Sequence, residues 1–497
     1  MRCKNFQLGL RVSRLKHSSA TALLHPPQIP CRQYSCYHNT VPNFYIENFG
    51  CRATQADGAA IERQLERRGF TPAEDSAHAD VVVLNTCTVT ASADQDARAA
   101  VRRIRRENSG CKILVTGCYA QRAPEEVAAL PGVSWVVGNS HKMQVADVIT
   151  GAFRSSNSAF VSLDSLRQPQ PDSGSLLVGD IFAHTELLAA PVFELGASAH
   201  KTRPNLKIQD GCDNRCSFCI IPFVRGQSRS LRAEEVLREV EALQQAGYRE
   251  IVLSGINLGR WGRDFAKQER FAGLLHLVLQ RTSIEKIRIS SVEPMDWNED
   301  LIGLMASSPR IAHHAHLPLQ SGSDRILRLM HRKYRPWHYA EKVQRIRELV
   351  PDAAIGADVM TGFPGEDEAA FEESRKFIEH LPFTYLHVFT YSPRPGTPSA
   401  SMPGQVPVQV ARERTRILRD LSASKNREFR ARFAGSRLQA ITLTQQDGSS
   451  TEALTDNYLK LRIAGRHPAN QWMNVHIDGL SGDGLLGSCQ QISSVSA

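Results

Sequence analysis

The 497-residue chain lacks any run that approaches the roughly 20 consecutive apolar residues of a membrane-spanning helix. Hydrophobic residues make up 41% of the chain and charged residues 22%, which is typical of a globular protein. The eleven cysteines are an odd number, and they favour a reducing compartment and metal ligation over a disulfide framework. We therefore expect a soluble, cytoplasmic protein with no membrane partner and with two or three domains.

The first 46 residues lack acidic side chains. They contain six basic residues, which leaves only +3 of the formal charge of +9 for the rest of the chain. Such a composition resembles an organelle transit peptide. A disordered extension, or a start site placed too far upstream, is the simpler interpretation, and we adopt it for residues 1–42. Cys3, Cys31 and Cys36 lie in this segment and receive no function.

The most informative stretch is a cysteine triplet that lacks a fourth member. Cys212, Cys216 and Cys219 are spaced C-x3-C-x2-C, and the aromatic Phe218 precedes the last of them. Three thiolates on one loop can hold three irons of a 4Fe–4S cluster, which otherwise takes four, so one iron stays open. An open iron can bind the amino and carboxylate groups of S-adenosylmethionine (SAM) and start radical chemistry. The alternatives are an incomplete zinc site, since structural zinc takes four ligands, or a trio without metal.

Three further cysteines share a structural context although they are far apart in the sequence. Cys51 follows Phe49 and Gly50, whereas Cys87 and Cys118 each follow an apolar run, so each lies at or just after the carboxyl end of a predicted buried strand. In an open α/β sheet, loops at that edge converge on ligands, so the three thiols can meet in space. The alternative is three ordinary buried cysteines.

The N-terminal third predicts an α/β sandwich with a parallel sheet, over residues 43–150. The expected strands are residues 43–46, 81–84, 113–115 and 135–137, and the expected helices are residues 58–68, 95–107 and 124–130. Hydrophobic periodicity then fails while Ser, Gly, Pro and Gln accumulate, so we place a linker at residues 151–203.

Strands and helices alternate again over residues 204–434, which predicts an incomplete (β/α) barrel with its active site at the carboxyl ends of the strands. The expected strands are residues 251–253, 286–289, 312–317, 354–359 and 385–389, with an amphipathic helix at 233–245. Residues 435–497 contain short strand-like runs at 438–443, 458–463 and 474–477, and they predict a small all-β module.

Five residues near the ends of these strands are candidates for binding SAM. Phe218 can pack against the adenine, while Gly255 and Asn257 end a strand where the backbone must approach the cofactor. Glu293 and Gln320 also lie near strand ends and can bond to its polar groups. A structural role is the alternative for each of the last four.

Positive charge is concentrated in two stretches outside the N-terminal segment. Residues 412–437 carry nine Lys or Arg against three acidic residues, and residues 102–106 contain four arginines. Either stretch can be a solvated helix face, but clusters of this kind also contact phosphates of nucleic acid.

Both cysteine sets and a series of ordered motifs resemble the methylthiotransferase family of radical-SAM enzymes over residues 43–480. The motifs are NTCTVT (85–90), VTGCYAQ (115–121), RGQSRS (225–230), LSGINLG (253–259), SSVEP (290–294), HLPLQSGS (316–323) and GFPGE (362–366). Within the family, the chain is most similar to the enzymes that modify N6-threonylcarbamoyladenosine next to the tRNA anticodon. Thr54 stands where these enzymes usually carry asparagine, and we expect it not to touch the thiolates.

The resemblance implies two 4Fe–4S clusters and SAM as cofactors. The cluster on Cys212, Cys216 and Cys219 would cleave SAM to a radical that removes hydrogen from C2 of the adenine at position 37. A second cluster, on Cys51, Cys87 and Cys118, would hold the sulfur that is inserted, and a second SAM would supply the methyl group. The C-terminal module would be of the substrate-binding TRAM type. The implied partners are the tRNA anticodon loop, an electron donor such as flavodoxin or ferredoxin, and a sulfur source.

Three alternatives remain at this point. The substrate can be another tRNA adenosine or an aspartate of a ribosomal protein, and the chain can be a non-catalytic iron–sulfur RNA-binding protein. The last is disfavoured because an open-iron triplet serves no binding purpose. Thr88 and Thr90, which follow Cys87, are expected to line a polar pocket for the threonylcarbamoyl group.

Overall fold

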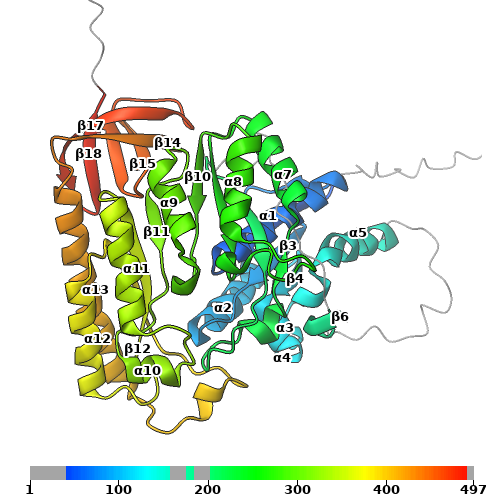
Figure 1. Cartoon of the computed structure of the whole chain (residues 1–497). Helices are drawn as coiled ribbons and strands as arrows, with labels where there is room; N and C mark the ends of the chain where they lie inside the picture. The colour runs from blue at the N-terminus through cyan, green and yellow to red at the C-terminus, as the bar shows by residue number, and fades with distance from the viewer. Residues whose placement is uncertain (1–40, 157–174, 184–201, 490–497) are drawn as a thin grey trace, which may run out of the picture. The chain divides into compact units, whose positions relative to one another are not determined.

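The computed structural model describes residues 41–156, 175–183 and 202–489, and the N-terminal extension therefore lies outside it, apart from its last two residues. Within the described ranges, the helices are too short or too polar to cross a membrane. The described chain contains two α/β regions whose strands are parallel except for β8, and a closed C-terminal β-barrel (Figure 1).

The first region is a six-stranded parallel sheet in the order β2-β1-β3-β4-β5-β6. Its strands are β1 (Asn43–Asn48), β2 (Thr71–Pro72), β3 (Val81–Thr86), β4 (Lys112–Gly117), β5 (Val133–Gly138) and β6 (Ser175–Leu177). Strand β3 is buried along its whole length, as expected for a parallel sheet that is covered on both faces. The predicted α/β sandwich is confirmed.

Alternate residues of β3 enter two different cores. Val81 and Val83 join the core that includes residues of α1 (Arg52–Arg67) and α5 (Val145–Ser156). Val82 and Leu84 join the core that includes residues of α2 (Ala91–Glu107), α3 (Cys118–Arg122) and α4 (Pro124–Ala128). Helices therefore cover both faces of the sheet, and loops occupy its carboxyl edge.

Part of the segment predicted as a linker belongs to the first sheet. β6 pairs with β5 in parallel, and α5 extends to Ser156. The sequence signal was weak because β6 is only three residues long and two of these are exposed. Residues 157–174 and 184–201 lie outside the described part.

The second region is the incomplete barrel that the sequence predicts. Strands β7 (Asn205–Asp210), β8 (Arg229–Ser230), β9 (Glu250–Gly255) and β10 (Lys286–Ile289) form one sheet in the order β10-β9-β7-β8. Strands β11 (His314–His316), β12 (Ala354–Thr361) and β13 (Tyr385–Thr390) form a second parallel sheet. A parallel bridge between Ile287 and Ile311 joins the two sheets, so one large hydrophobic core lies behind both of them.

Helices connect the strands of this partial barrel. They are α6 (Ile221–Arg225), α7 (Ala233–Gln245), α8 (Phe271–Arg281), α9 (Glu299–Ser307), α10 (Asp324–Leu329), α11 (Pro336–Leu349), α12 (Glu368–His380) and α13 (Val408–Ala431). The expected helix at 233–245 has the bounds of α7.

The C-terminal module is a closed five-stranded barrel in the order β14-β15-β16-β18-β17, which confirms the predicted all-β module. Its strands are β14 (Arg437–Asp447), β15 (Ser450–Thr455), β16 (Lys460–Ala464), β17 (Trp472–Ser481) and β18 (Gly484–Ser488). The strand expected at 458–463 begins two residues later because Tyr458 has a positive φ of 67°, which ends the preceding turn.

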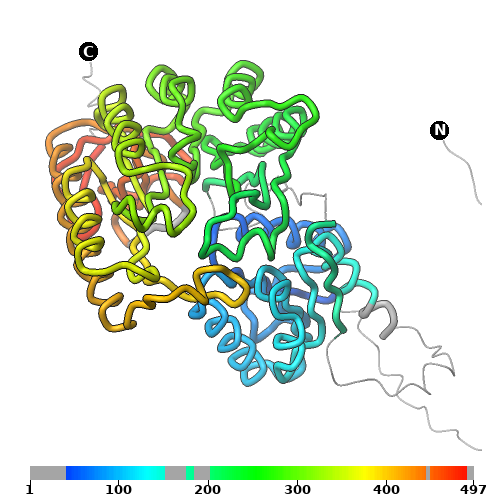
Figure 2. The backbone as a smooth tube through the Cα atoms, turned by 60° about the horizontal axis from the view of Figure 1, so that its bottom comes forward, coloured from blue at the N-terminus to red at the C-terminus, as the bar shows by residue number. Residues whose placement is uncertain are grey.

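The loop after β13 lies against the start of α2, as the tube in Figure 2 shows. The Ser392 hydroxyl accepts a hydrogen bond from the Ala91 backbone N–H at 3.0 Å. Arg394 pairs with the buried Asp94 carboxylate of α2. These contacts connect the partial barrel to the first sheet near Cys87.

Candidate active site

The cysteine triplet lies on the loop between β7 and α6. The loop begins at Gly211, whose φ is 71°, and a Cβ there would lie 1.8 Å from the Gln227 carbonyl oxygen, so only glycine fits. The Cys212 backbone N–H donates to the Gly226 carbonyl at 3.1 Å, which closes the loop. The spacing of the three cysteines therefore places them on one tight turn at the carboxyl end of a barrel strand.

Hydrogen-bond donors point at two of these sulfurs. Cys212 Sγ accepts from the Asn214 backbone N–H at 3.4 Å and from Asn257 Nδ2 at 3.6 Å. Cys216 Sγ accepts from Arg332 Nη1 at 3.3 Å. Such donors stabilise sulfur that carries negative charge.

The protein environment alone does not deprotonate the whole triplet. Burial, followed by the neighbouring thiols Cys216 and Cys212, raises the pKa of Cys219 to about 12. A bound cationic centre would lower the pKa of these thiols again, since coordinated thiols are deprotonated. The three residues therefore fit a cluster that takes thiolate ligands.

The structure also brings together the three distant cysteines. Cys51 precedes α1, Cys87 follows β3, and Cys118 begins α3 directly after β4. A Cβ on Gly50 would lie 2.8 Å from Cys87 Sγ, so the chain around Cys51 comes very close to Cys87. Burial, then Cys118 and Cys51, raises the pKa of Cys87 to about 12. The strands β1, β3 and β4 are neighbours, so their carboxyl ends meet at one edge, as the sequence predicts.

Thr54 contacts this second triad, contrary to the sequence prediction. Its side chain is completely buried on α1, one turn after Cys51, and its Oγ1 lies 3.6 Å from Cys51 Sγ. The same oxygen accepts a hydrogen bond from Arg225 Nη2 at 3.4 Å. Residues three apart on a helix share a face, and that rule would have identified the contact.

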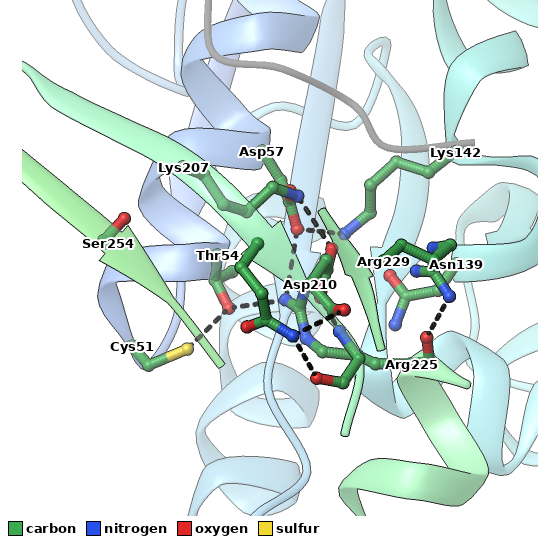
Figure 3. Close-up of polar contacts among 12 residues, drawn as sticks. Cys51, Thr54, Asp57, Asn139, Lys142, Lys207, Asp210, Arg225, Arg229 and Ser254 are labelled. Carbon is green, nitrogen blue, oxygen red and sulfur yellow. Dashed lines mark hydrogen bonds and ion pairs between the residues drawn. The ribbon is translucent and has the colours of Figure 1, made fainter. Parts of the chain in front are cut away.

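A buried ionic network lies beside the second triad (Figure 3). Asp57 of α1 binds Lys142 at 2.8 Å and Arg225 of α6 at 3.1 Å, and it also binds Lys207 of β7. Asp210 of β7 binds Lys207 at 2.8 Å and Arg225 at 3.0 Å. Three cations face two carboxylates, which leaves one positive charge near the thiols.

The two triads lie on loops that touch each other. Cys118 packs with Ile220 and Val224, and Ile220 directly follows Cys219. Asn139 Nδ2 donates to the Val224 carbonyl at 2.7 Å and lies 3.5 Å from Cys118 Sγ. Residues from the first sheet and from the partial barrel therefore form one continuous site.

Two of the five candidate SAM-binding residues lie beside the triplet. Asn257 reaches Cys212, and Glu293 pairs with Arg332, which in turn donates to Cys216. Gln320 has a positive φ of 65°, and its buried Oε1 has no hydrogen-bond partner among the described residues.

The other two candidates, Phe218 and Gly255, pack against protein side chains, and this packing accounts for their residue types. The Phe218 ring packs edge-on against Phe363 with ring centroids 6.3 Å apart. A Cβ on Gly255 would lie 2.9 Å from the Gln209 side chain, so glycine leaves room for Gln209. Gln209 in turn donates to the carbonyls of Asp210 and Gly211, both at 2.9 Å, where the cysteine loop begins.

Arg332 was not found from the sequence, although it contacts a candidate ligand. It follows α10, more than 100 residues after Cys216, and its side chain is only 5% exposed. No local spacing connects it to the triplet. A buried arginine requires an anionic partner, but the sequence does not show which one.

The sequence predicts that Thr88 lines a pocket, and this prediction is wrong. It is fully buried, and its hydroxyl donates to Asp94 at 2.6 Å and accepts from Arg122 at 2.9 Å and from Arg394 at 2.8 Å. The Thr90 hydroxyl accepts from the Ala93 backbone N–H at 3.2 Å and thereby caps α2.

Most of the basic stretch 412–437 is used inside the molecule. Intramolecular hydrogen bonds or ion pairs hold Arg414, Arg416, Arg419, Lys425, Arg430 and Arg432. Arg430, for example, donates to the carbonyls of Gly482 and Gly484 in the turn between β17 and β18. Arg412 and Arg427 are exposed, and within the described ranges neither makes a hydrogen bond or an ion pair. Phosphate contact from this stretch stays a prediction, and Arg427 is a better test of it than Arg430.

Comparison with known families gives two matches. Residues 43–138 match the uncharacterized protein family UPF0004, and residues 206–378 match the radical SAM superfamily. Together the two matches contain all six cysteines of the two triads.

Comparison with individual proteins gives matches along most of the chain. The threonylcarbamoyladenosine tRNA methylthiotransferase MtaB of Aquifex aeolicus is 35% identical over 87% of this chain and 99% of that protein. The protein of the same name from Bacillus subtilis is 37% identical over 84% of this chain and 90% of that protein. The tRNA-2-methylthio-N(6)-dimethylallyladenosine synthase of Aquifex aeolicus is 32% identical over 86% of this chain and 91% of that protein.

Solved structures show the same fold at low sequence identity. The radical S-adenosylmethionine methyltransferase TsrM of Kitasatospora setae superposes with a TM-score of 0.51 at 14% identity, over 73% of this chain and 75% of that one. The likeness supports the assignment of the fold.

Proposed function

The chain belongs to the radical-SAM tRNA methylthiotransferases, and within that family we propose that it modifies C2 of N6-threonylcarbamoyladenosine at position 37 of tRNA. The observation that carries this proposal is the similarity to proteins named for threonylcarbamoyladenosine, at 35% and 37% identity over 84–87% of the chain. The relative named for dimethylallyladenosine is 32% identical, and a comparison of the two substrates distinguishes the two activities.

Unpaired buried polar atoms support a polar base substituent. Among the described residues, Asn257 Oδ1, Ser290 Oγ and Gln320 Oε1 are buried without a hydrogen-bond partner, and these three residues follow the carboxyl ends of the barrel strands β9, β10 and β11. A threonylcarbamoyl group carries a carboxylate, a hydroxyl and a urea that can pair with such atoms. A dimethylallyl group is only hydrocarbon and would leave them unpaired, at a cost of about 1–3 kcal/mol for each atom.

We further propose that the chain uses two clusters. Family membership brings SAM and one 4Fe–4S cluster, which Cys212, Cys216 and Cys219 would hold. Cys51, Cys87 and Cys118 would hold the second cluster. When bound, the first cluster supplies the electron that cleaves SAM, and the second supplies the sulfur.

The chain's own residues position these groups. Asn257 and Arg332 donate to the sulfurs of the first triad, and Gly211 permits its tight turn. Arg225 and its ionic partners hold α6, β7 and α1 together, so the second triad stays next to the first. An electron donor and a sulfur source complete the proposed reaction.

The test is a comparison of two tRNA substrates. The reconstituted enzyme is incubated with SAM and a reductant, and with an anticodon stem-loop that carries either threonylcarbamoyladenosine or dimethylallyladenosine. Mass spectrometry of the nucleosides then measures the 2-methylthio product. We expect product from the threonylcarbamoyl substrate and a rate several orders of magnitude lower with the other. Equal turnover of both substrates would keep the family and overturn the proposed substrate.

A further inference from the structure

Three adjacent strands of the partial barrel each contribute one metal-binding side chain to the same face. These side chains are His316 of β11, Asp358 of β12 and His387 of β13. Asp358 is the direct register partner of His387, and His316 pairs with Gly356, two residues before Asp358. Paired residues, and residues two apart on one strand, point to the same side of a sheet. The backbone register therefore places the three side chains together.

The distances between the donor atoms fit one bound cation. Asp358 Oδ1 lies 3.5 Å from His316 Nε2 and 3.3 Å from His387 Nδ1, and one donor atom from each residue lies within 4.8 Å of the others. Zinc lies about 2.0–2.1 Å from such ligands, and a tetrahedral site therefore separates its ligand atoms by about 3.4 Å. The two carboxylate–imidazole distances are close to this value.

His316 is held in the orientation that a metal ligand needs. Its side chain is 6% exposed, and its Nδ1 lies 2.8 Å from the Ser291 hydroxyl oxygen. Its Nε2 is buried and has no hydrogen-bond partner among the described residues. Histidines that bind metals usually bond through the other ring nitrogen to a second group, which fixes the ring. The free nitrogen of His316 faces the Asp358 carboxylate and the His387 ring.

Among the described residues, the ion pairs of Asp358 are those with His316 and His387. The Tyr385 ring packs against the rings of His316 and His387, while Arg52 acts on His316, and Arg332 on Asp358, only through longer-range electrostatics. A carboxylate between two imidazoles, one with an unused buried nitrogen, is a typical donor set for a borderline divalent metal.

We propose that His316, Asp358 and His387 bind a divalent metal ion of the zinc class, separate from both cysteine triads. Three protein ligands leave one position for water or another oxygen, as in zinc sites that are not purely structural. His387 is about two-thirds exposed, so the ion can enter from its side.

Elemental analysis of the cluster-loaded enzyme tests this proposal. The enzyme is incubated with zinc, freed of loosely bound metal on a chelating resin, and analysed for zinc and iron. We expect about one zinc per chain in addition to the cluster iron. His316→Ala and His387→Ala should weaken zinc binding by more than about 100-fold, because loss of a supporting group alone costs about 10- to 100-fold. His380→Ala changes an exposed histidine of α12 and should bind zinc like the unchanged chain.

Two further measurements keep the result interpretable. Ser291→Ala leaves all three ligands in place and should weaken binding about 10- to 100-fold, even if a ligand variant fails to fold. Cobalt(II) in this site should lack the thiolate charge-transfer bands that binding to a cysteine triad would give. Zinc bound equally by the unchanged chain, His316→Ala and His387→Ala would overturn the proposal, as would thiolate bands in the cobalt spectrum.

Discussion

The two cysteine triads reach similar positions by different routes. Cys212, Cys216 and Cys219 lie within eight residues on one loop, so a local turn assembles them, which Gly211 permits and a Cys212–Gly226 backbone hydrogen bond closes. Cys51, Cys87 and Cys118 come from three places in the chain, and the neighbouring strands β1, β3 and β4 assemble them. The first triad therefore depends on a turn, and the second depends on a sheet.

The supporting contacts differ in the same way. Neutral and charged donors contact the first triad directly, from Asn257 and Arg332. At the second triad, Thr54 contacts Cys51 and Asn139 contacts Cys118, and a network of buried charges beside them joins α1, β7 and α6. Replacing a residue that supports the first triad should therefore affect its chemistry. Replacing a residue that supports the second triad should affect the stability of the fold around it.

The largest effect is expected from removing either triad. Cluster reconstitution should give about 8 Fe per chain, and replacing Cys212, Cys216 and Cys219 with Ala should leave about 4 and abolish cleavage of SAM. Replacing Cys51, Cys87 and Cys118 with Ala should also leave about 4 Fe but should spare cleavage of SAM while product disappears. Iron analysis and detection of 5′-deoxyadenosine measure both outcomes. Loss of all iron in either triple variant, in folded protein, would show one shared site.

Breaking the buried network should destabilise the chain strongly. Asp57→Asn leaves Lys142, Lys207 and Arg225 with one carboxylate, and loss of one partner of a buried ion pair costs about 3–5 kcal/mol. Denaturant unfolding measures this loss. Asp147→Asn is the matched control, because it breaks a surface pair with Arg68 whose side chains are 63% and 30% exposed. The control should cost less than about 1 kcal/mol. Equal losses would show that the network does not join the two regions.

Arg332 should influence the first triad alone. Arg332→Met removes a charge-assisted hydrogen bond to Cys216 Sγ, worth about 1.5–3 kcal/mol, so cleavage of SAM should fall about 10- to 100-fold. Arg332→Lys should recover part of the rate, and Arg328→Met, on an exposed side chain, should have little effect. The midpoint potential of the first cluster should move while iron at the second triad stays unchanged. A shift at both clusters would contradict a local role.

The charge network also predicts that the free energy of unfolding depends on pH in the acidic range. Burial raises the pKa of Asp57, but Lys142, Lys207 and Arg225 outweigh burial and lower the pKa from 3.8 to about 2. The carboxylate therefore contributes its full stability above about pH 4 and loses it as the pH falls through 2, for a change of about 2 kcal/mol. Without clusters, the unchanged chain and Asp57→Asn differ in their free energy of unfolding. This difference should become about 2 kcal/mol smaller between pH 4 and pH 2. A constant difference would show that Asp57 is not held by these cations.

Sequence reasoning located the parts of this site that follow from periodicity and spacing. Strand-end positions led to Cys51, Cys87 and Cys118, and a short motif led to the triplet. The alternation of strands and helices predicted the fold class and α7. Residues that act across long separations were missed, because Arg332 and Lys142 have no sequence pattern that names their partners. Gly255 was assigned to the cofactor because its close neighbour, Gln209, lies 46 residues earlier in the chain.

The smallest effect is expected at Thr54, where the two kinds of support meet. Its hydroxyl accepts a hydrogen bond from Arg225 at 3.4 Å and lies 3.6 Å from Cys51 Sγ. Arg225 also donates a hydrogen bond to the Asp57 carboxylate at 3.1 Å. Thr54→Val retains the shape and loses only the hydroxyl, so the free energy of unfolding should fall by about 0.5–1.5 kcal/mol. Thr54→Asn offers both an acceptor for Arg225 and a donor for the sulfur, so it should retain iron and activity. If Thr54→Val lowered the iron from about 8 to about 4 per chain, the second triad would depend on a single hydroxyl as locally as the first depends on its turn.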